Sequence, residues 1–191
     1  MPSGEEIQRY LTGAWRLMTG RADGLAMLDL SADGFWNSFF AIVVALPVLL
    51  ATWVPVTNEA SGPDSPFSAR LLYLAGLAFV DLATWLVPLA LLAVAARPLG
   101  IADRFVPYVV ASNWGSALLI WFALPVALLG LFWPQGSVVA DLAGIVILLG
   151  TLFLAWRLTV TVLARGPALG SGVFFGMAVS VAILFLLHPQ F

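Results

Sequence analysis

Five long apolar stretches occupy most of this chain, and each is long enough to cross a lipid bilayer. The hydrocarbon core of a bilayer is about 30 Å thick, so a spanning helix needs roughly 20 apolar residues. The pattern predicts an all-α fold, a polytopic integral membrane bundle of five transmembrane helices. The predicted spans are residues 35–56, 71–96, 105–132, 138–156 (with an extension to 163 left open) and 168–187.

Composition supports the membrane class. The 191 residues are 62% hydrophobic and 9% charged, whereas soluble domains carry about a quarter charged residues. We expect two parts, a cytoplasmic N-terminal segment at 1–34 and the five-span bundle at 35–191. The net charge of −2 gives no reason to expect a nucleic-acid partner. The expected partners are the lipid bilayer itself and either a second copy of the chain or another membrane protein.

The chain offers few groups for catalysis. It has no cysteine, which excludes disulfides, thiolate metal sites and a thiol nucleophile, and it has one histidine. Acid–base chemistry needs at least two positioned groups within hydrogen-bond reach, and no such pair is visible. We therefore expect no enzymatic activity, no catalytic residues, no metal site and no cofactor. All basic residues are arginine and Ala, Leu and Gly are abundant, which suggests a GC-rich bacterial genome.

The arginines predict an orientation. Short cytoplasmic loops carry an excess of basic residues, and five spans make successive loops alternate between the two sides. Seven of the eight arginines fall on the side of the N-terminus, and only Arg70 falls on the other. The N-terminus is therefore predicted to be cytoplasmic and the C-terminus periplasmic, in a bacterial inner membrane. The seven are Arg9, Arg16, Arg21, Arg97, Arg104, Arg157 and Arg165.

Residues 5–19 have the pattern of an amphipathic helix. Apolar residues recur at the i, i+3, i+4 spacing of one helix face, and Gly20 is a plausible C-terminal stop. We predict that this helix lies in the headgroup layer, with Arg9, Trp15 and Arg16 at the membrane surface. The alternative is that it packs against the loops of its own bundle. After it, Ser31 or Asp33 is expected to cap the first spanning helix.

Tryptophans fall into two groups. Four stand near the predicted ends of spans, where an indole prefers the headgroup zone, and three lie deeper and are expected to pack inside the bundle. The first group is Trp36, Trp53, Trp133 and Trp156, and the second is Trp85, Trp114 and Trp121.

Asp81 is the most unusual polar residue, because it lies near the middle of the second span. A carboxylate there should face the bundle interior and find a partner. Thr84 lies one turn further on, and Asn113 and Arg157 lie at comparable depth in other spans. Together they form a candidate intramembrane polar site for proton or ion coupling. The alternative is a structural polar cluster that fixes helix register, with Arg157 extending to the inner headgroups.

The last span carries a stripe of small residues. Ala168, Gly172, Gly176 and Ser180 recur every fourth residue, a pattern that lets another helix approach closely. We predict a helix–helix interface along this stripe, used either within the chain or between chains. Within the chain, Gly115 and its neighbour Ala111 form a candidate partner surface.

The layout of the whole chain resembles the Yip-type family, the Ypt/Rab-interacting membrane proteins and their bacterial relatives. The likeness is one of layout and hydrophobic rhythm. That family has a cytoplasmic N-terminus, five spans and almost no extramembrane domain. The resemblance implies an integral membrane scaffold or accessory protein and no set of catalytic residues. The segments that carry it are AWRLMTGRADGLAML (14–28), RFVPYVVASNWGSALLIW (104–121) and LFLAWRLTVTVLARGPALGSGVFF (152–175).

Two functions from different classes follow from these patterns. The leading hypothesis is a non-enzymatic membrane scaffold or accessory protein that acts through helix–helix contacts. The alternative is a small transporter or channel with its polar site around Asp81. An intramembrane enzyme is the weakest reading, since Asp81 has no acidic or histidine partner visible in the sequence.

Overall fold

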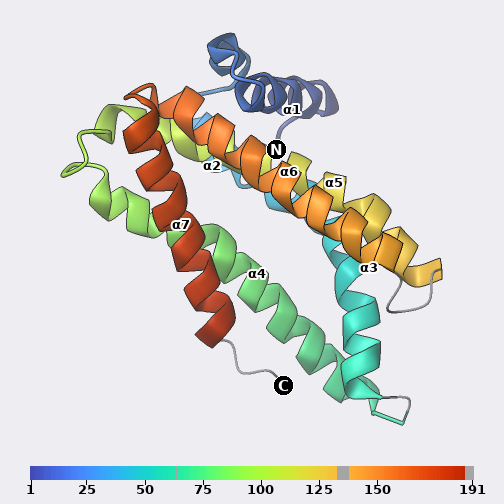
Figure 1. Cartoon of the computed structure of the whole chain (residues 1–191). Coiled ribbons are helices and arrows are strands. Elements are labelled where there is room, and N and C mark those ends of the chain that lie inside the picture. Colours follow the sequence, from blue (N-terminus) through green and yellow to red (C-terminus); the bar gives the residue numbers. More distant parts are fainter. Residues whose placement is uncertain (63, 133–137, 188–191) are drawn as a thin grey trace.

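The computed structural model describes residues 1–62, 64–132 and 138–187, and these fold into helices with no strand among them (Figure 1). Five of the helical segments are long and apolar enough to cross a membrane, with α2 and α3 together forming the first. The predicted fold class, an all-α polytopic membrane bundle, is therefore confirmed. In chain order the elements are α1 (Gly4–Met18), η1 (Ala22–Met27), α2 (Ala32–Ser38), α3 (Ala41–Ser61), α4 (Phe67–Ala95), η2 (Ala102–Arg104), α5 (Phe105–Phe132), α6 (Val138–Leu163) and α7 (Pro167–Leu187).

The ends of the third and fifth spans lie within one residue of the prediction, whereas the first span ends at Ser61, five residues later than predicted, and the second begins at Phe67, four residues earlier. The third span has the predicted bounds, and the fourth continues to Leu163, which resolves the open extension. The first span is interrupted at Phe39 and Phe40, a break that the continuous apolar run concealed. Of the two candidate caps, Ser31 is the one used, because its hydroxyl accepts the N–H of Gly34 at 3.0 Å. Gly20, with a φ of +85°, ends α1 as predicted.

The buried core lies at one end of the bundle, which we call the core end. There α4 and α6 end, α5 and α7 begin, and residues such as Ile101, Trp114 and Leu163 are almost fully buried. In the most apolar window of Ala102–Pro125, 44% of residues are buried, against 11–22% in the other four spans. Toward the opposite end, which we call the open end, α6 and α7 present large apolar side chains on the protein surface. Those side chains must be surrounded by lipid, because exposing so much apolar surface to water would be unfavourable.

Helix α1 packs on the flank of the bundle (Figure 1). Its residues Ala14 and Leu17 are fully buried against α5 and α6, and the ring of Tyr10 lies 5.1 Å from that of Trp114. Helix α1 therefore packs against its own bundle, as the alternative reading had it, but on helices and not on loops. Gly13 allows η1 to fold back onto α1, because a Cβ there would lie 2.9 Å from the carbonyl oxygen of Gly24.

The segments that carry seven of the eight arginines gather at the core end, and Arg70, at the start of α4, lies at the other end. Arg165, between α6 and α7, binds both carboxylate oxygens of Asp103 in η2, at 2.9 and 2.8 Å. Arg157 donates to the carbonyl oxygen of Thr19, at the end of α1, at 3.3 Å. Residues 133–137, which include Trp133, and residues 188–191 belong to the loop and tail without arginine, and they lie outside the described residues.

Candidate functional site

The carboxylate of Asp81 is held by an indole group. Asp81 lies at the middle of α4, and its Oδ2 accepts a hydrogen bond from Nε1 of Trp53 on α3 at 2.7 Å. Among the described residues, no cation forms an ion pair with Asp81. Thr84 donates to the backbone carbonyl of Asp81 at 2.9 Å, so it does not bind the carboxylate. Asp81 therefore links α3 to α4 through a neutral donor.

Trp53 does not have the environment that the sequence predicted. Its position near the end of a span indicated the headgroup zone, yet its side chain is only 8% exposed. The hydrogen bond to Asp81 explains the difference, because an indole N–H inside a membrane needs an acceptor, and the carboxylate provides one. The position of Trp53 in the span predicted its depth in the bilayer, but it did not predict the direction in which the side chain points.

Asn113 belongs to a separate polar cluster. Its Oδ1 accepts from Nε1 of Trp85 on α4 at 2.8 Å, and its Nδ2 donates to the hydroxyl of Ser38 on α2 at 2.8 Å. Ser38 in turn donates to the carbonyl oxygen of Phe35 at 2.7 Å. Asn113 and Ser38 are fully buried, so this chain of bonds joins three helices in the core. Such a satisfied buried network specifies one arrangement of helices.

The predicted polar site is thus divided among three places. Asp81 pairs with Trp53, Asn113 pairs with Trp85 and Ser38, and Arg157 binds the end of α1. Thr84 remains close to Asp81 along α4. Sequence reasoning missed the two tryptophan partners. The separation of 28 residues that Trp53–Asp81 and Trp85–Asn113 share becomes visible only once the pairs are known, so it gave no signal in the sequence.

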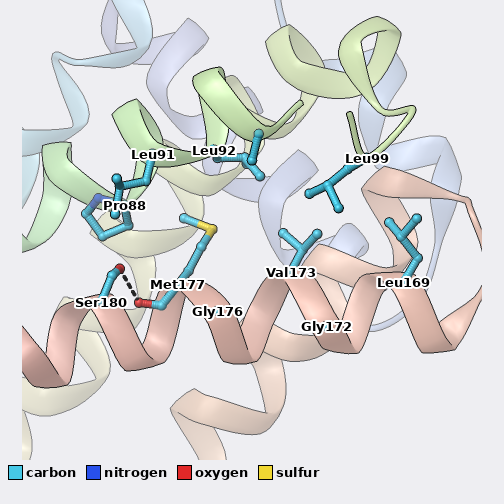
Figure 2. Close-up of a pocket in the computed structure, with 11 residues that line it drawn as sticks. Pro88, Leu91, Leu92, Leu99, Leu169, Gly172, Val173, Gly176, Met177 and Ser180 are labelled. Atoms are coloured by element: carbon cyan, nitrogen blue, oxygen red, sulfur yellow. Dashed lines mark hydrogen bonds between the residues drawn. The ribbon is translucent and has the colours of Figure 1, made fainter. Parts of the chain in front are cut away.

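The small-residue stripe of α7 faces a groove. Gly172, Gly176 and Ser180 line one side of a space of about 400 Å³, and α4 lines the other side with Pro88 and Leu92 (Figure 2). A Cβ at either glycine would meet no atom within 4 Å. The stripe therefore does not bring α4 and α7 into close contact along this groove. Ala168 is exposed and is not part of the groove lining.

Other glycines of the bundle are used for close packing. A Cβ at Gly115 would lie 2.7 Å from Leu158 and 3.0 Å from Met18, and a Cβ at Gly170 would lie 2.8 Å from Val160. Gly115 thus packs against α6 and α1 and is not the partner surface for the α7 stripe that the sequence suggested. Gly115 and Gly170 therefore allow close packing within the chain, whereas Gly172 and Gly176 do not.

The three residues predicted at the membrane surface all lie on α1. Arg9 is exposed and sits over the ring of Tyr10, and Arg16 forms an ion pair with Asp23 at 2.6 Å. Trp15 is 42% exposed and makes an edge contact with Phe122 of α5.

A larger cavity lies between two pairs of helices. Its volume is about 780 Å³, and its walls come mainly from α4 and α7 on one side and α5 and α6 on the other. Near the core end, the hydroxyl of Tyr108 lies 3.3 Å from that of Thr159 and donates to Sδ of Met177 at 3.1 Å. Neither Asp81, Asn113 nor Arg157 lines this cavity.

Comparison of the chain with protein-family models, with curated proteins and with solved structures found no match. The geometry of the described residues is therefore the basis for any functional conclusion. In that part of the chain no group of three or more His, Cys, Asp or Glu side chains is arranged to hold a metal ion.

Proposed function

We propose that this protein is a non-enzymatic integral membrane scaffold or accessory protein that acts through helix–helix contacts with itself or with another membrane protein. The observation that carries the proposal is that Gly172 and Gly176 are left unpacked by the rest of the chain. They belong to a small-xxx-small stripe, the pattern that permits close helix approach, yet the chain's own helices leave them exposed beside a groove. A second helix is the partner that such a stripe fits.

The double substitution Gly172→Leu, Gly176→Leu tests this interface. Both added side chains would enter open space within the protomer, so the fold should survive while a helix from outside would be blocked. Gly150→Leu is the matched control, because Gly150 is also exposed and unobstructed but lies on α6, away from the groove. The readout is the mass of the gently solubilised complex and the identity of proteins that purify with the N-terminally tagged chain.

We expect the wild type and Gly150→Leu to purify as one complex of fixed stoichiometry, and the double variant to lose it. Two copies of this chain in that complex would identify a homo-oligomer, and a constant second protein would identify an accessory subunit. A double variant with the same assembly as the wild type would refute the interface.

The membrane setting is part of the same proposal. We infer an inner membrane of a bacterium from the composition, and a cytoplasmic N-terminus and a periplasmic C-terminus from the distribution of arginines. The exposed face of α1, with Arg9 and Trp15, would then lie in the inner headgroup layer. The layout resembling the Yip-type family is consistent with a scaffold role.

The second candidate is a small transporter or channel, and one observation favours it. Asp81 lies in the middle of a span with a neutral indole as its side-chain partner, and among the described residues no arginine forms an ion pair with its carboxylate. Asp81→Asn keeps an acceptor for Trp53 and removes the titratable group. If Asp81 couples transport, this variant should fold normally but lose proton or ion flux in liposomes. A wild-type protein that carries no flux would remove the support for this function.

A further inference from the structure

The larger cavity is long enough to hold a lipid tail. Its lining on α5 extends from Tyr108 to Ala123, a rise of about 22 Å at 1.5 Å per residue. On the antiparallel α6 it extends from Thr159 to Gly144, over the same distance. The hydrocarbon region of one leaflet is about 15 Å deep, half of the bilayer core. The cavity is therefore longer than a single leaflet, and its volume of about 780 Å³ is in the range of ligand sites.

The cavity lining changes character along its length. Toward the core end it includes the hydroxyls of Tyr108, Ser112 and Thr159. At mid-depth it includes those of Ser116 and Thr151, and α3 and α4 add those of Thr52 and Thr84. Toward the open end its walls are aliphatic, with Ala123, Gly144, Ile147 and Val181 among them. An occupant that matches this gradient has oxygen atoms at one end and a hydrocarbon chain at the other.

The polar part of the cavity carries no charge. No Asp, Glu or Arg side chain is among the described residues that line it. A phosphate or carboxylate head would therefore be placed among neutral hydroxyls in a low-dielectric site, which is unfavourable without a counter-charge. Most of the hydroxyls donate to nearby acceptors, but Ser116 makes no hydrogen bond with any described residue. Its hydroxyl is available to a ligand.

We propose that this cavity, which is open on one side, binds a neutral lipid with a small, uncharged, oxygen-bearing head and a single long hydrocarbon chain between the two pairs of helices. The head lies among the hydroxyls from Tyr108 to Ser116, and the chain extends toward Gly144. An ordinary anionic bilayer lipid has a similar tail that could enter the cavity. Its charged head would stay at the membrane surface, however, and would not reach the hydroxyls. The proposal does not depend on the α7 interface, because Gly172 and Gly176 do not line this cavity.

A photoreactive monoacylglycerol is the probe for this site. The full chain is placed in nanodiscs and exposed to the probe in increasing amounts, and the labelled peptides are identified by mass spectrometry. We expect saturable labelling of cavity residues such as Ile147 and Ala123. Unlabelled monoacylglycerol should compete at least tenfold better than a lysophosphatidate with the same tail. Labelling that never saturates, or equal competition by the charged lipid, would overturn the proposal.

A pair of glycines on α6 gives a test by substitution. A Cβ at Gly144 or at Gly150 would meet no atom within 4 Å, but only Gly144 lines the cavity. Gly144→Phe should fill the tail region and reduce saturable labelling at least tenfold, whereas Gly150→Phe should leave it unchanged. Equal labelling in both variants would contradict the proposal. If Gly144→Phe fails to fold, the competition between neutral and charged lipids on the wild-type chain still decides it.

Ser116→Ala tests the position of the head. The probe's affinity should fall several-fold, while an alkane probe of the same length, which has no oxygen to bind, should be unaffected. An equal loss for both probes would mean that Ser116 shapes the cavity and does not contact the head.

Discussion

Gly20 follows α1 with a φ of +85°, and its missing side chain leaves room for the guanidinium of Arg157. A Cβ at Gly20 would lie 1.9 Å from Nη2 of Arg157. Gly20→Ala should therefore lower stability by about 1–2 kcal/mol through the backbone alone. It should lose about another 1 kcal/mol because Arg157 must leave the carbonyl of Thr19. The free energy of unfolding, measured by SDS titration of the micelle-bound protein, reports the sum of these two losses.

Gly166 provides the control for this prediction. Its φ is +89°, and a Cβ there would meet nothing within 4 Å, so Gly166→Ala should show only the backbone term. In an Arg157→Ala background, Gly20→Ala should cost only the backbone term, because the hydrogen bond to Thr19 is already absent and no guanidinium is left to clash with the new Cβ. Equal losses for the two alanine variants would mean that Arg157 does not hold the end of α1.

Asn113 is the residue on which the buried polar network depends. Asn113→Leu leaves the indole N–H of Trp85 without its acceptor, which should lower stability by about 1–3 kcal/mol. Combining it with Trp85→Phe removes the donor as well, so the double variant should be less destabilised than the sum of the single variants. The same SDS titration measures this coupling. Strict additivity would show that the 2.8 Å contact contributes nothing.

Helix α1 and η1 pack with their backbones close together. A Cβ at Gly13 would lie 2.9 Å from the carbonyl oxygen of Gly24, so Gly13→Ala should separate η1 from α1. Alanine favours a helix over glycine by about 1 kcal/mol, so propensity alone predicts the opposite effect. We expect faster tryptic cleavage after Arg21 in Gly13→Ala than in the wild type. Gly4→Ala, which is unobstructed, should cleave at the wild-type rate.

Helix positions could be predicted from the sequence to a large degree. Each residue of a span contributes separately to the free energy of transfer into lipid, so a run of apolar residues is enough to reveal the span. The bounds of α5 and α7 show this, with at most one residue of difference. Which side chains meet could not be predicted in this way. In a bundle where every face of a span is apolar, periodicity does not indicate the inward face, so the partners of Asp81 and Asn113 stayed hidden. The break at Phe39 and Phe40 was missed because the apolar run continues through it.

The whole molecule has all its arginines except Arg70 in segments at the core end, and this gives the topology a direct test. The chain has no cysteine, so single cysteines can be placed in loops without a background signal. A cysteine replacing Gly62 should react with a membrane-impermeant maleimide added outside intact cells. One replacing Gly100 should react only after the membrane is opened. The reverse pattern would place the N-terminus outside the cytoplasm.

The uneven position of the core has a consequence for how this sequence can change over time. Near the core end, Gly13, Gly115 and Gly170 each have another atom within 3 Å of where a side chain would begin, so few replacements fit. Toward the open end, most side chains face lipid, and one aliphatic residue serves as well as another. A saturation mutagenesis library selected for folded protein should therefore show tolerance that rises from the core end to the open end. Neutral drift would therefore change the residues toward the open end of the helices first, while those positions would stay hydrophobic.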